Sequence, residues 1–299
     1  MSGTALALAL LIADPVILGT TPAPGPLPQA SGTMETLQGE ADLQDRMTVN
    51  VALQGKGPFR FLIDTGSQRT VVSTALAGNL GLVIGPQVRV IGMAGEGNVA
   101  TAKVDTLGFG SREIYDLIVP LLENRHIGAD GILGTDSLQD QRVLLDFKHN
   151  TITIGDAREL GGSAGYEIVV HARKRSGRLI MTNAMIDGVR VDVVIDTGAS
   201  GTVGNLALRH AMHEHTQATA VLSSVTGHEL SADIGFAREL NIKDLKIGNV
   251  VIAYADAPAF SELGLAQRPA VFLGMRELRA FKRVAIDFSS RKILFDLSR

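Results

Sequence analysis

The heptapeptide FLIDTGS at residues 61–67 recurs in altered form as VVIDTGA at residues 193–199, and these two stretches decide the fold. Each is an apolar, β-type run that ends on an aspartate, Asp64 or Asp196, and the glycine two positions later turns the chain into a sharp loop. Two acidic loops of one kind can face each other. Two carboxyl groups held close together cannot both ionise at moderate pH, so they share a proton. The sequence therefore predicts a paired-carboxylate site that can activate water and protonate a carbonyl oxygen.

The duplication extends well beyond these loops. Matched positions keep their order in both halves, and their spacing grows from 132 to 141 residues: the pairs are Gly66 and Gly198, Gly95 and Gly227, Gly110 and Gly248, Gly134 and Gly274, and Asp146 and Asp287. Conserved order with slowly growing spacing indicates a tandem duplication rather than a chance pair of motifs.

Further motifs accompany both copies. A Thr-Val pair follows each loop at residues 70–71 and 202–203, and the triplets ILG at 132–134 and FLG at 272–274 come later in each half. Together with DTG and a glycine-rich hairpin, this pattern resembles the aspartic proteases, and most of all bacterial retropepsin-like proteases with two halves in one chain. The resemblance covers roughly residues 40–299. It implies an all-β, bilobal, pseudo-twofold acid-protease fold with short helices.

The resemblance also implies roles for the loop residues. Asp64 and Asp196 would hold a water between them and hydrolyse a peptide bond, with no metal, cofactor or covalent intermediate. Each loop threonine would cross-link the two loops through the opposing backbone, and each glycine would let amide groups approach the carboxylates. The supporting residues of the loops are Thr65, Gly66, Ser67, Thr197, Gly198 and Ala199.

The two loops differ at the position after DTG. Ser67 can offer a hydroxyl to Asp64, whereas Ala199 gives Asp196 no such donor. A hydrogen bond to an ionised carboxylate favours the ionised form. We therefore expect Asp64 to be the more acidic partner and Asp196 to carry the shared proton, although the pair titrates as a unit.

Glycine-rich segments at residues 91–97 and 225–228 read as mobile hairpin tips. By resemblance they are flaps that close over an extended polypeptide and bind it by strand addition; the alternative is a pair of plain surface hairpins. The flap tyrosine of the pepsins is absent, so substrate preferences cannot be carried over from them. The candidate flap residues are Gly92, Met93, Ala94, Gly95, Thr226 and Gly227.

The function expected from these residues is that of an aspartic endopeptidase. The alternatives are a catalytically silent peptide-binding or regulatory protein on the same fold, and an enzyme that processes a single cellular partner. Retention of both aspartates, both threonines and both glycines favours the enzyme. Because each half carries a DTG, a dimer is not required for catalysis.

Composition excludes several other classes. Hydrophobic residues make up 45% of the 299, which gives each lobe enough to bury a core, and the net charge is only −3. There is no Trp, only three Tyr and no basic stripe, so nucleic acid is not expected as a partner. The basic run at residues 173–175 with Arg178 reads as a solvated connector. The sequence contains no Cys, which removes disulfides, thiolate metal sites and thiol nucleophiles.

His210, His213 and His215 are the only metal-like grouping, and no Cys or HExxH arrangement joins them. They read as a polar helix face, so no metal is expected. The recurring Asp146 and Asp287 lie inside apolar segments that end in turns, and they read as structural acids.

Four segments follow from these patterns: a signal-like or disordered segment at 1–39, a first lobe at 40–157, a connector at 158–165 and a second lobe at 166–299. The apolar run at residues 5–13 favours export to the periplasm or secretion, with a cytoplasmic location as the alternative. The run is shorter than the roughly 20 residues that a membrane span needs.

Hairpins are expected over residues 47–63 and 179–195, each delivering one aspartate. Ser73 and Asn205 are expected to cap helices over 74–80 and 206–213, and helical turns are expected at 135–139 and 275–280.

Overall fold

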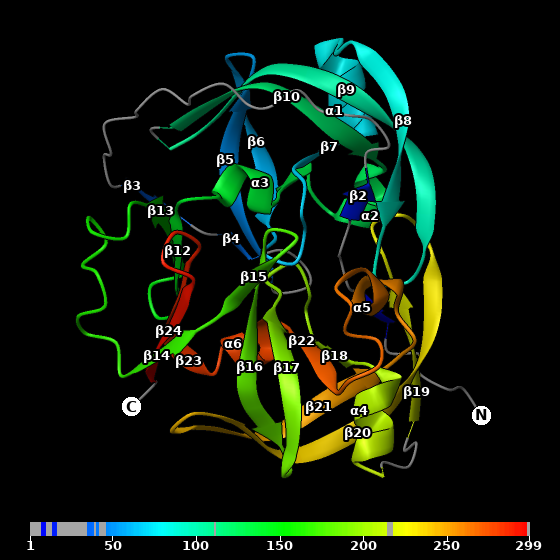
Figure 1. Ribbon diagram of the computed structural model, residues 1–299. Coiled ribbons are helices and arrows are strands. Elements are labelled where there is room, and N and C mark those ends of the chain that lie inside the picture. The colour runs from blue at the N-terminus through cyan, green and yellow to red at the C-terminus, as the bar shows by residue number, and fades with distance from the viewer. Residues whose placement is uncertain are drawn as a thin grey trace.

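The structure is a computed structural model that describes residues 7–9, 14–16, 35–38, 40–41, 46–110, 112–213 and 218–297. Within this part of the chain the strands form three sheets joined by a few short helices, so the all-β, bilobal expectation is confirmed. Figure 1 shows the first half as the upper lobe and the second half as the lower lobe, with the third sheet along one side of both.

The first lobe is one sheet built around the strand that ends at Asp64. In spatial order its strands are β2 (Asp14–Val16), β8 (Ile84–Ile91), β9 (Glu96–Phe109), β10 (Arg112–Leu122), β7 (Val71–Ser73), β11 (Gly131–Leu133), β6 (Lys56–Ile63), β5 (Met47–Leu53) and β4 (Glu40–Ala41). The short β11 lies between β6 and β7 and runs parallel to β6. This insertion places the ILG triplet directly beside the end of the strand that delivers Asp64.

The second lobe repeats this order around the strand that ends at Asp196. Its strands are β1 (Ala7–Ala9), β19 (Ala218–Ser223), β20 (Glu229–Ile242), β21 (Leu245–Tyr254), β18 (Thr202–Gly204), β22 (Ala270–Leu273), β17 (Val189–Ile195), β16 (Arg178–Ile186) and β15 (Arg173–Arg175). Here β22 lies between β17 and β18 and runs parallel to β17. The tandem halves of the sequence are therefore two copies of one sheet topology.

The third sheet joins the lobes. Its order is β14 (Ile168–His171), β24 (Lys292–Leu297), β23 (Phe281–Asp287), β12 (Arg142–Asp146), β13 (Thr151–Gly155) and β3 (Glu35–Gln38). The central pair, β12 with β23, brings together the closing segments of the two halves, with Leu144 opposite Ala285. Residues 156–165 form turns between the lobes, where the connector was expected; the exact segment boundaries stay a prediction.

Short helices follow the sheets where local sequence allows them. They are α1 (Thr74–Leu80), α2 (Asn124–Ile127), α3 (Thr135–Leu138), α4 (Leu206–Ala211), α5 (Pro258–Glu262) and α6 (Met275–Leu278). The expected caps are confirmed: the Ser73 side chain accepts from the Leu76 N–H, and the Asn205 side chain accepts from the Leu208 N–H. Each cap satisfies a backbone donor that a helix start leaves unpaired.

The basic run at 173–175 is exposed, as a solvated segment should be, but it forms β15 at the edge of the second-lobe sheet. Arg178 differs from it. That side chain is 0% exposed, so the expectation of a solvated connector is wrong for Arg178. Arg178 is the first residue of β16, and its side chain donates to the Gly66 carbonyl oxygen of the first lobe instead of facing solvent.

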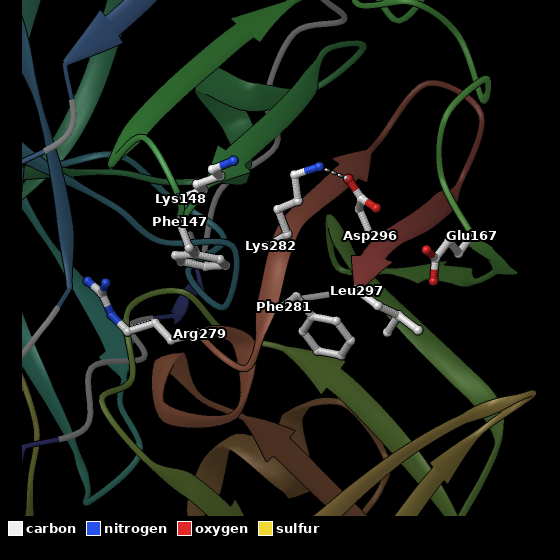
Figure 2. A pocket seen from close by; sticks show the side chains of 8 residues that line it. All are labelled: Phe147, Lys148, Glu167, Arg279, Phe281, Lys282, Asp296 and Leu297. Carbon is white, nitrogen blue, oxygen red and sulfur yellow. Dashed lines mark ion pairs between the residues drawn. The ribbon is translucent and has the colours of Figure 1, made fainter. Parts of the chain in front are cut away.

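A hollow of about 600 Å³ opens on the third sheet (Figure 2). Its walls combine aromatic and charged side chains: Phe147, Lys148, Glu167, Arg279, Phe281, Lys282, Asp296 and Leu297. The Arg279 guanidinium lies over the Phe147 ring, 5.5 Å from its centroid, and Lys282 Nζ lies 3.5 Å from Asp296. Lys282 and Asp296 thus pair within the wall of the hollow.

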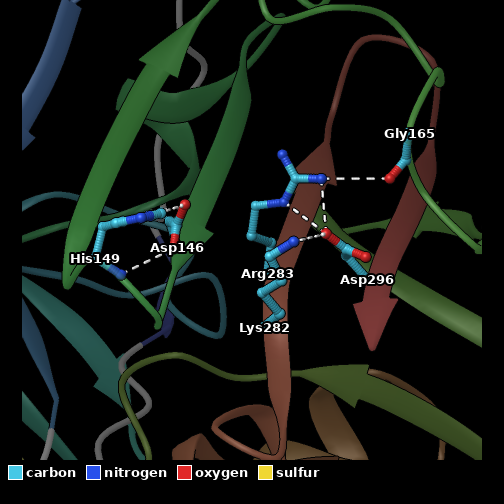
Figure 3. A network of polar contacts seen from close by, with 6 residues as sticks. All are labelled: Asp146, His149, Gly165, Lys282, Arg283 and Asp296. Atoms are coloured by element: carbon cyan, nitrogen blue, oxygen red, sulfur yellow. Dashed lines mark hydrogen bonds and ion pairs between the residues drawn. The ribbon is translucent and has the colours of Figure 1, made fainter. Parts of the chain in front are cut away.

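Beside this hollow, polar contacts stabilise the turns of the third sheet (Figure 3). Arg283 binds Asp296 at 2.7 Å and donates to the Gly165 carbonyl oxygen at 3.3 Å, which ties the connector to β23. Asp146 accepts from the His149 backbone N–H at 3.0 Å. The expectation that Asp146 is a structural turn acid agrees with this contact.

Candidate active site

Asp64 and Asp196 stand at the ends of β6 and β17, where the parallel neighbour strand fixes their position. The Asp64 N–H donates to the Leu133 carbonyl oxygen at 3.1 Å, and the Asp196 N–H donates to the Leu273 carbonyl oxygen at 3.0 Å. In each lobe, the aspartate thus makes the last backbone hydrogen bond between its strand and the parallel neighbour strand. Both aspartates leave their sheets at equivalent points.

Reciprocal threonine bonds cross-link the two loops. Thr65 Oγ1 donates to the Ile195 carbonyl oxygen at 2.9 Å, and Thr197 Oγ1 donates to the Ile63 carbonyl oxygen at 2.7 Å. Each hydroxyl oxygen also accepts from the other threonine's backbone N–H, at 3.1 and 3.3 Å. All four bonds span the lobes, so they run as the resemblance implies and hold the loops at a fixed separation.

The loop glycines bring the two carboxyl groups together. A Cβ at Gly66 would lie 2.7 Å from Cγ of Asp196, and a Cβ at Gly198 would lie 2.4 Å from Cγ of Asp64. Such contacts are far shorter than ordinary van der Waals distances, so any side chain at either position would push the opposite carboxyl group away. Glycine is required at both positions because each carboxyl group packs against the backbone of the opposing loop.

Each carboxyl group has one bonded and one unbonded oxygen. Asp64 Oδ1 accepts from the Gly66 N–H at 2.8 Å and from the Ser67 N–H at 2.9 Å, whereas Asp196 Oδ1 accepts from the Gly198 N–H at 3.0 Å. Among the described residues, Oδ2 of both aspartates is buried with no hydrogen-bond partner. A buried oxygen without a partner costs free energy, so these two atoms are suited to bind a polar group that enters the site.

Burial dominates the ionisation of the pair. It raises the pKa of Asp64 to about 7, against the opposing effects of the Gly66 N–H bond, the Arg178 charge, the Ser67 N–H bond and the Arg46 charge. Burial also raises the pKa of Asp196 well above its usual value, and the neighbouring Asp64 charge raises it further. The two carboxyl groups therefore share one proton near neutral pH, as two acids in one site must.

The hairpin tips between β8 and β9 and between β19 and β20 each reach the opposite lobe. Met93, from the first lobe, is 0% exposed and belongs to an apolar cluster of the second lobe that includes Leu222 and Phe260. Val225, from the second lobe, is 0% exposed and packs in a first-lobe cluster that includes Val90. The tips are therefore crossed and anchored rather than free surface hairpins.

The two tips also meet each other. A Cβ at Gly95 would lie 2.7 Å from the His228 ring, so the imidazole lies directly against the first tip. Gly227 has φ of 80°, and a Cβ there would lie 2.5 Å from the His126 ring of α2. His228 is bonded to Thr226 Oγ1 at 2.9 Å. Both tip glycines thus allow a histidine to pack closely on the backbone.

Two family models match this chain. The gag-polyprotein aspartyl protease family matches residues 49–140, and the aspartyl protease family matches residues 182–276. The chain belongs to the retropepsin-like aspartyl proteases. Each match contains one DTG loop, one hairpin tip and one apolar-apolar-Gly triplet, so the two halves of this aspartyl protease are both recognised. No curated protein sequence matches the chain.

One expectation about the dyad of this aspartyl protease is wrong. The Ser67 hydroxyl donates to the Arg69 carbonyl oxygen at 2.9 Å instead of to Asp64, and it is the Ser67 backbone N–H that reaches the carboxylate. Burial raises the pKa of both aspartates, so the expected order of their acidity stays a prediction. In its favour, Asp64 accepts two backbone N–H bonds, whereas the second loop provides Asp196 with the Gly198 bond.

Behind each loop of the aspartyl protease, an acid supports a threonine. Thr70 Oγ1 donates to Asp136 at 2.7 Å, and Thr202 Oγ1 donates to Glu277 at 2.5 Å. The same hydroxyl oxygens accept from the backbone N–H of the triplet glycines, Gly134 and Gly274. Sequence reasoning found the Thr-Val pairs but missed the acids, although an acid follows each triplet by two or three residues.

Two further features were missed by sequence reasoning, the buried arginines Arg46 and Arg178. Both charges lower the pKa of Asp64. Their only sequence signal is their spacing of 132 residues, the same as that between Asp64 and Asp196. Arginine is almost never fully buried unless it is paired, so a sequence reading places both on the surface by default.

In the described part of the chain, no group of three or more His, Asp or Glu side chains could hold a metal ion, and His215 lies outside it. None of the described helices has the length and apolarity to cross a membrane. The hollow of Figure 2 is lined by residues of the third sheet and its turns, and it includes no residue of the two loops.

Proposed function

We propose that this aspartyl protease is an active endopeptidase that hydrolyses a peptide bond within an extended polypeptide segment, with Asp64 and Asp196 as its catalytic pair. The observation that supports this most is the contact between each buried carboxyl group and the opposing loop glycine. Among the described residues, Oδ2 of each aspartate is also buried without a hydrogen-bond partner. A water molecule and a substrate carbonyl are the polar groups that such a pair can serve.

In the proposed mechanism, the ionised member removes a proton from water as the water attacks the scissile carbonyl carbon. Asp64 suits this role because its carboxylate accepts two backbone N–H bonds, which favour the charged form. Asp196 suits the acid role because its raised pKa retains the proton that it donates to the carbonyl oxygen. The proton that Asp64 took from water then passes to the leaving nitrogen as the C–N bond breaks, and a hydroxyl of the tetrahedral intermediate returns its proton to Asp196.

The crossed hairpin tips suit a substrate in extended form. Gly92 and Gly95 close the first tip with a backbone bond of 2.7 Å, and the opposite tip carries Thr226 and Gly227. With both tips anchored in opposite lobes, a chain bound beneath them is shielded from water, and it gains backbone hydrogen bonds in the manner of an added strand. We assign Gly92, Met93, Ala94, Gly95, Thr226 and Gly227 to this flap role.

The proposed site is complete within one chain, because the bonds between Thr65 and Thr197 already join the two loops. Neither nucleic acid nor a second copy of the chain is needed for it.

We also propose that the protein is exported, on the evidence of the apolar run near its N-terminus. Sequencing the N-terminus of the mature protein from cell fractions tests this. An intact Met1 on protein recovered from the cytoplasm would contradict it.

The function is tested by incubating proteome-derived peptides with wild type and with Asp64→Asn from about pH 3 to about pH 8 and reading the products by mass spectrometry. The proposal predicts new internal termini with wild type and none with the variant. Peptides that bind but stay intact at every pH would instead identify a silent binding protein, and cleavage of one protein but no generic peptide would identify a single-partner protease.

A further inference from the structure

Arg178 begins β16 in the second lobe, yet its side chain reaches the active loop of the first lobe. It is 0% exposed, and its Nε donates to the carbonyl oxygen of Gly66 at 2.5 Å. The preceding Gly177 has φ of 80°, and a Cβ there would lie 2.4 Å from Thr135 Oγ1 in α3 of the first lobe. The backbone before Arg178 is therefore pressed against the first lobe, which fixes where the guanidinium enters.

From this geometry we propose that Arg178 is a positioning residue of the dyad: it holds the Gly66 carbonyl across the lobe interface and keeps a permanent positive charge close to both carboxyl groups, which sets the pH range in which the pair shares its proton. The proposal deepens the proposed function, since it concerns the same site. An arginine suits it because its charge persists at every relevant pH and its planar fork binds in a fixed direction.

The charge of Arg178 acts on both aspartates. It opposes burial in each case and so lowers the pKa of Asp64 and of Asp196. Among the described residues, the Arg46 charge also lowers the pKa of Asp64, and the Asp64 charge raises that of Asp196. Without Arg178, burial and mutual repulsion would keep the pair protonated to higher pH.

Two further acids lie behind the loops, the half-buried Asp136 of α3 and the buried Glu277 of α6. They are bonded to Thr70 and Thr202, and burial raises the pKa of each. Their carboxyl groups contact these threonines rather than the dyad.

Arg46 is the internal comparison. It occupies the matching position of the first half, 132 residues earlier, and is 2% exposed. Its Nη2 donates to the Ile127 carbonyl oxygen at 2.9 Å, at the end of α2 in its own lobe. Of the effects that lower the pKa of Asp64, Arg46 is the smallest. Duplication thus produced two buried arginines at matching positions.

The test measures kcat/KM against pH and, independently of activity, the titration of the dyad by ¹³C NMR of the aspartate carboxyl carbons, assigned with Asp64→Asn and Asp196→Asn. The variants are Arg178→Met, Arg178→Gln, Arg178→Lys and, as the matched control, Arg46→Met. Removing the charge in the Met and Gln variants should move both limbs of the pH profile, and the carboxyl titration, upward by about one pH unit. The Lys variant should titrate near the wild-type pH with kcat several-fold lower, and Arg46→Met should shift less than Arg178→Met.

Folded Met and Gln variants whose carboxyl groups titrate as in wild type would overturn the proposal, even if their activity fell. A wild type that cleaves nothing, but whose carboxyl titration shifts in these variants, would refute the proposed function and leave the role of Arg178 standing. If Arg178→Met and Arg178→Gln are unfolded at neutral pH, both should regain their fold near pH 4, where the dyad is protonated. Failure of both to fold at either pH would contradict the electrostatic role.

Discussion

At the scale of single residues, the site depends on two glycines that have no side chain. Gly66 and Gly198 leave room for the carboxyl group of the opposite lobe, and the dyad exists because neither position has a Cβ. The threonine bonds fix the distance between the loops, and the glycines leave room for the carboxyl groups at that distance. Activity should therefore be more sensitive to one added methyl group here than at a glycine whose Cβ would meet nothing within 4 Å, such as Gly78.

Gly198→Ala is expected to lower kcat/KM by about 100-fold or more, because its Cβ would lie 2.4 Å from Cγ of Asp64 and displace that carboxyl group. Gly78→Ala is the matched control, since a Cβ at this exposed position of α1 meets nothing within 4 Å. The control should keep full activity and stabilise the helix by up to about 1 kcal/mol. Equal activities of the two variants in a steady-state assay would refute the close contact.

The dyad should also make stability depend on pH. The pKa of Asp64 rises from 3.8 to about 7 on folding and that of Asp196 rises as well, so between these pH values the folded protein binds more protons than the unfolded chain. The contribution of the pair to the free energy of unfolding is then greatest below pH 4 and is lost as pH rises through about 7.

Asp64→Asn/Asp196→Asn removes this titration. Relative to wild type, the double variant should gain about 1–3 kcal/mol of unfolding free energy between pH 4 and pH 7. Urea unfolding of both proteins at several pH values measures the difference. A difference that stays constant, or shrinks, as pH rises would show that the folded dyad does not hold a proton.

The residues predicted from sequence and those missed differ in how local their signals are. The DTG motif predicts Asp64 and Asp196 because the acid and the glycine of the loop lie within three consecutive residues. The donor to Asp64 was assigned to the wrong atom of Ser67, because a hydroxyl can rotate to another acceptor, here the Arg69 carbonyl oxygen. Arg178 was missed because its partner, Gly66, lies 112 positions away.

At the scale of elements, each lobe depends on the other to bury its hairpin tip. Met93 and Val225 are both 0% exposed in clusters of the opposite lobe, although their strands belong to their own sheets. Alternation and turn residues predicted the strands and helix caps well, because those signals are local. They could not predict the crossing, because an apolar residue at a hairpin tip does not reveal which lobe receives it.

Met93→Ala should loosen the first tip and lower kcat/KM about tenfold, mainly through a higher KM, because a buried methionine in the second-lobe cluster is lost. Hydrogen exchange over residues 84–97 should become faster. Val83→Ala is the control, since that side chain is 74% exposed just before β8 and its loss should change neither quantity. Wild-type kinetics and exchange in Met93→Ala would mean that the anchored tip does not matter for substrate binding.

At the scale of the whole molecule, two copies of one sheet are joined at two levels. The threonine bonds join the active loops, and the pairing of β12 with β23 joins the closing segments, where Arg142 binds Asp287 at 2.8 Å in the buried interior. The resemblance implied the bilobal fold and the sequence spacing implied its pseudo-symmetry. Neither could reveal the buried ion pair, whose partners lie 145 positions apart.

The central claim is that one chain holds one dyad, made of Asp64 from the first half and Asp196 from the second. The most direct test is to measure kcat/KM of Asp64→Asn, of Asp196→Asn and of an equimolar mixture of the two variants, each checked for a wild-type fold by circular dichroism. All three samples should retain less than about 1% of wild-type activity, because no chain in the mixture carries both carboxyl groups. Activity restored in the mixture would show a site shared between chains, and activity near wild type in either single variant would show that the pair does not perform the hydrolysis.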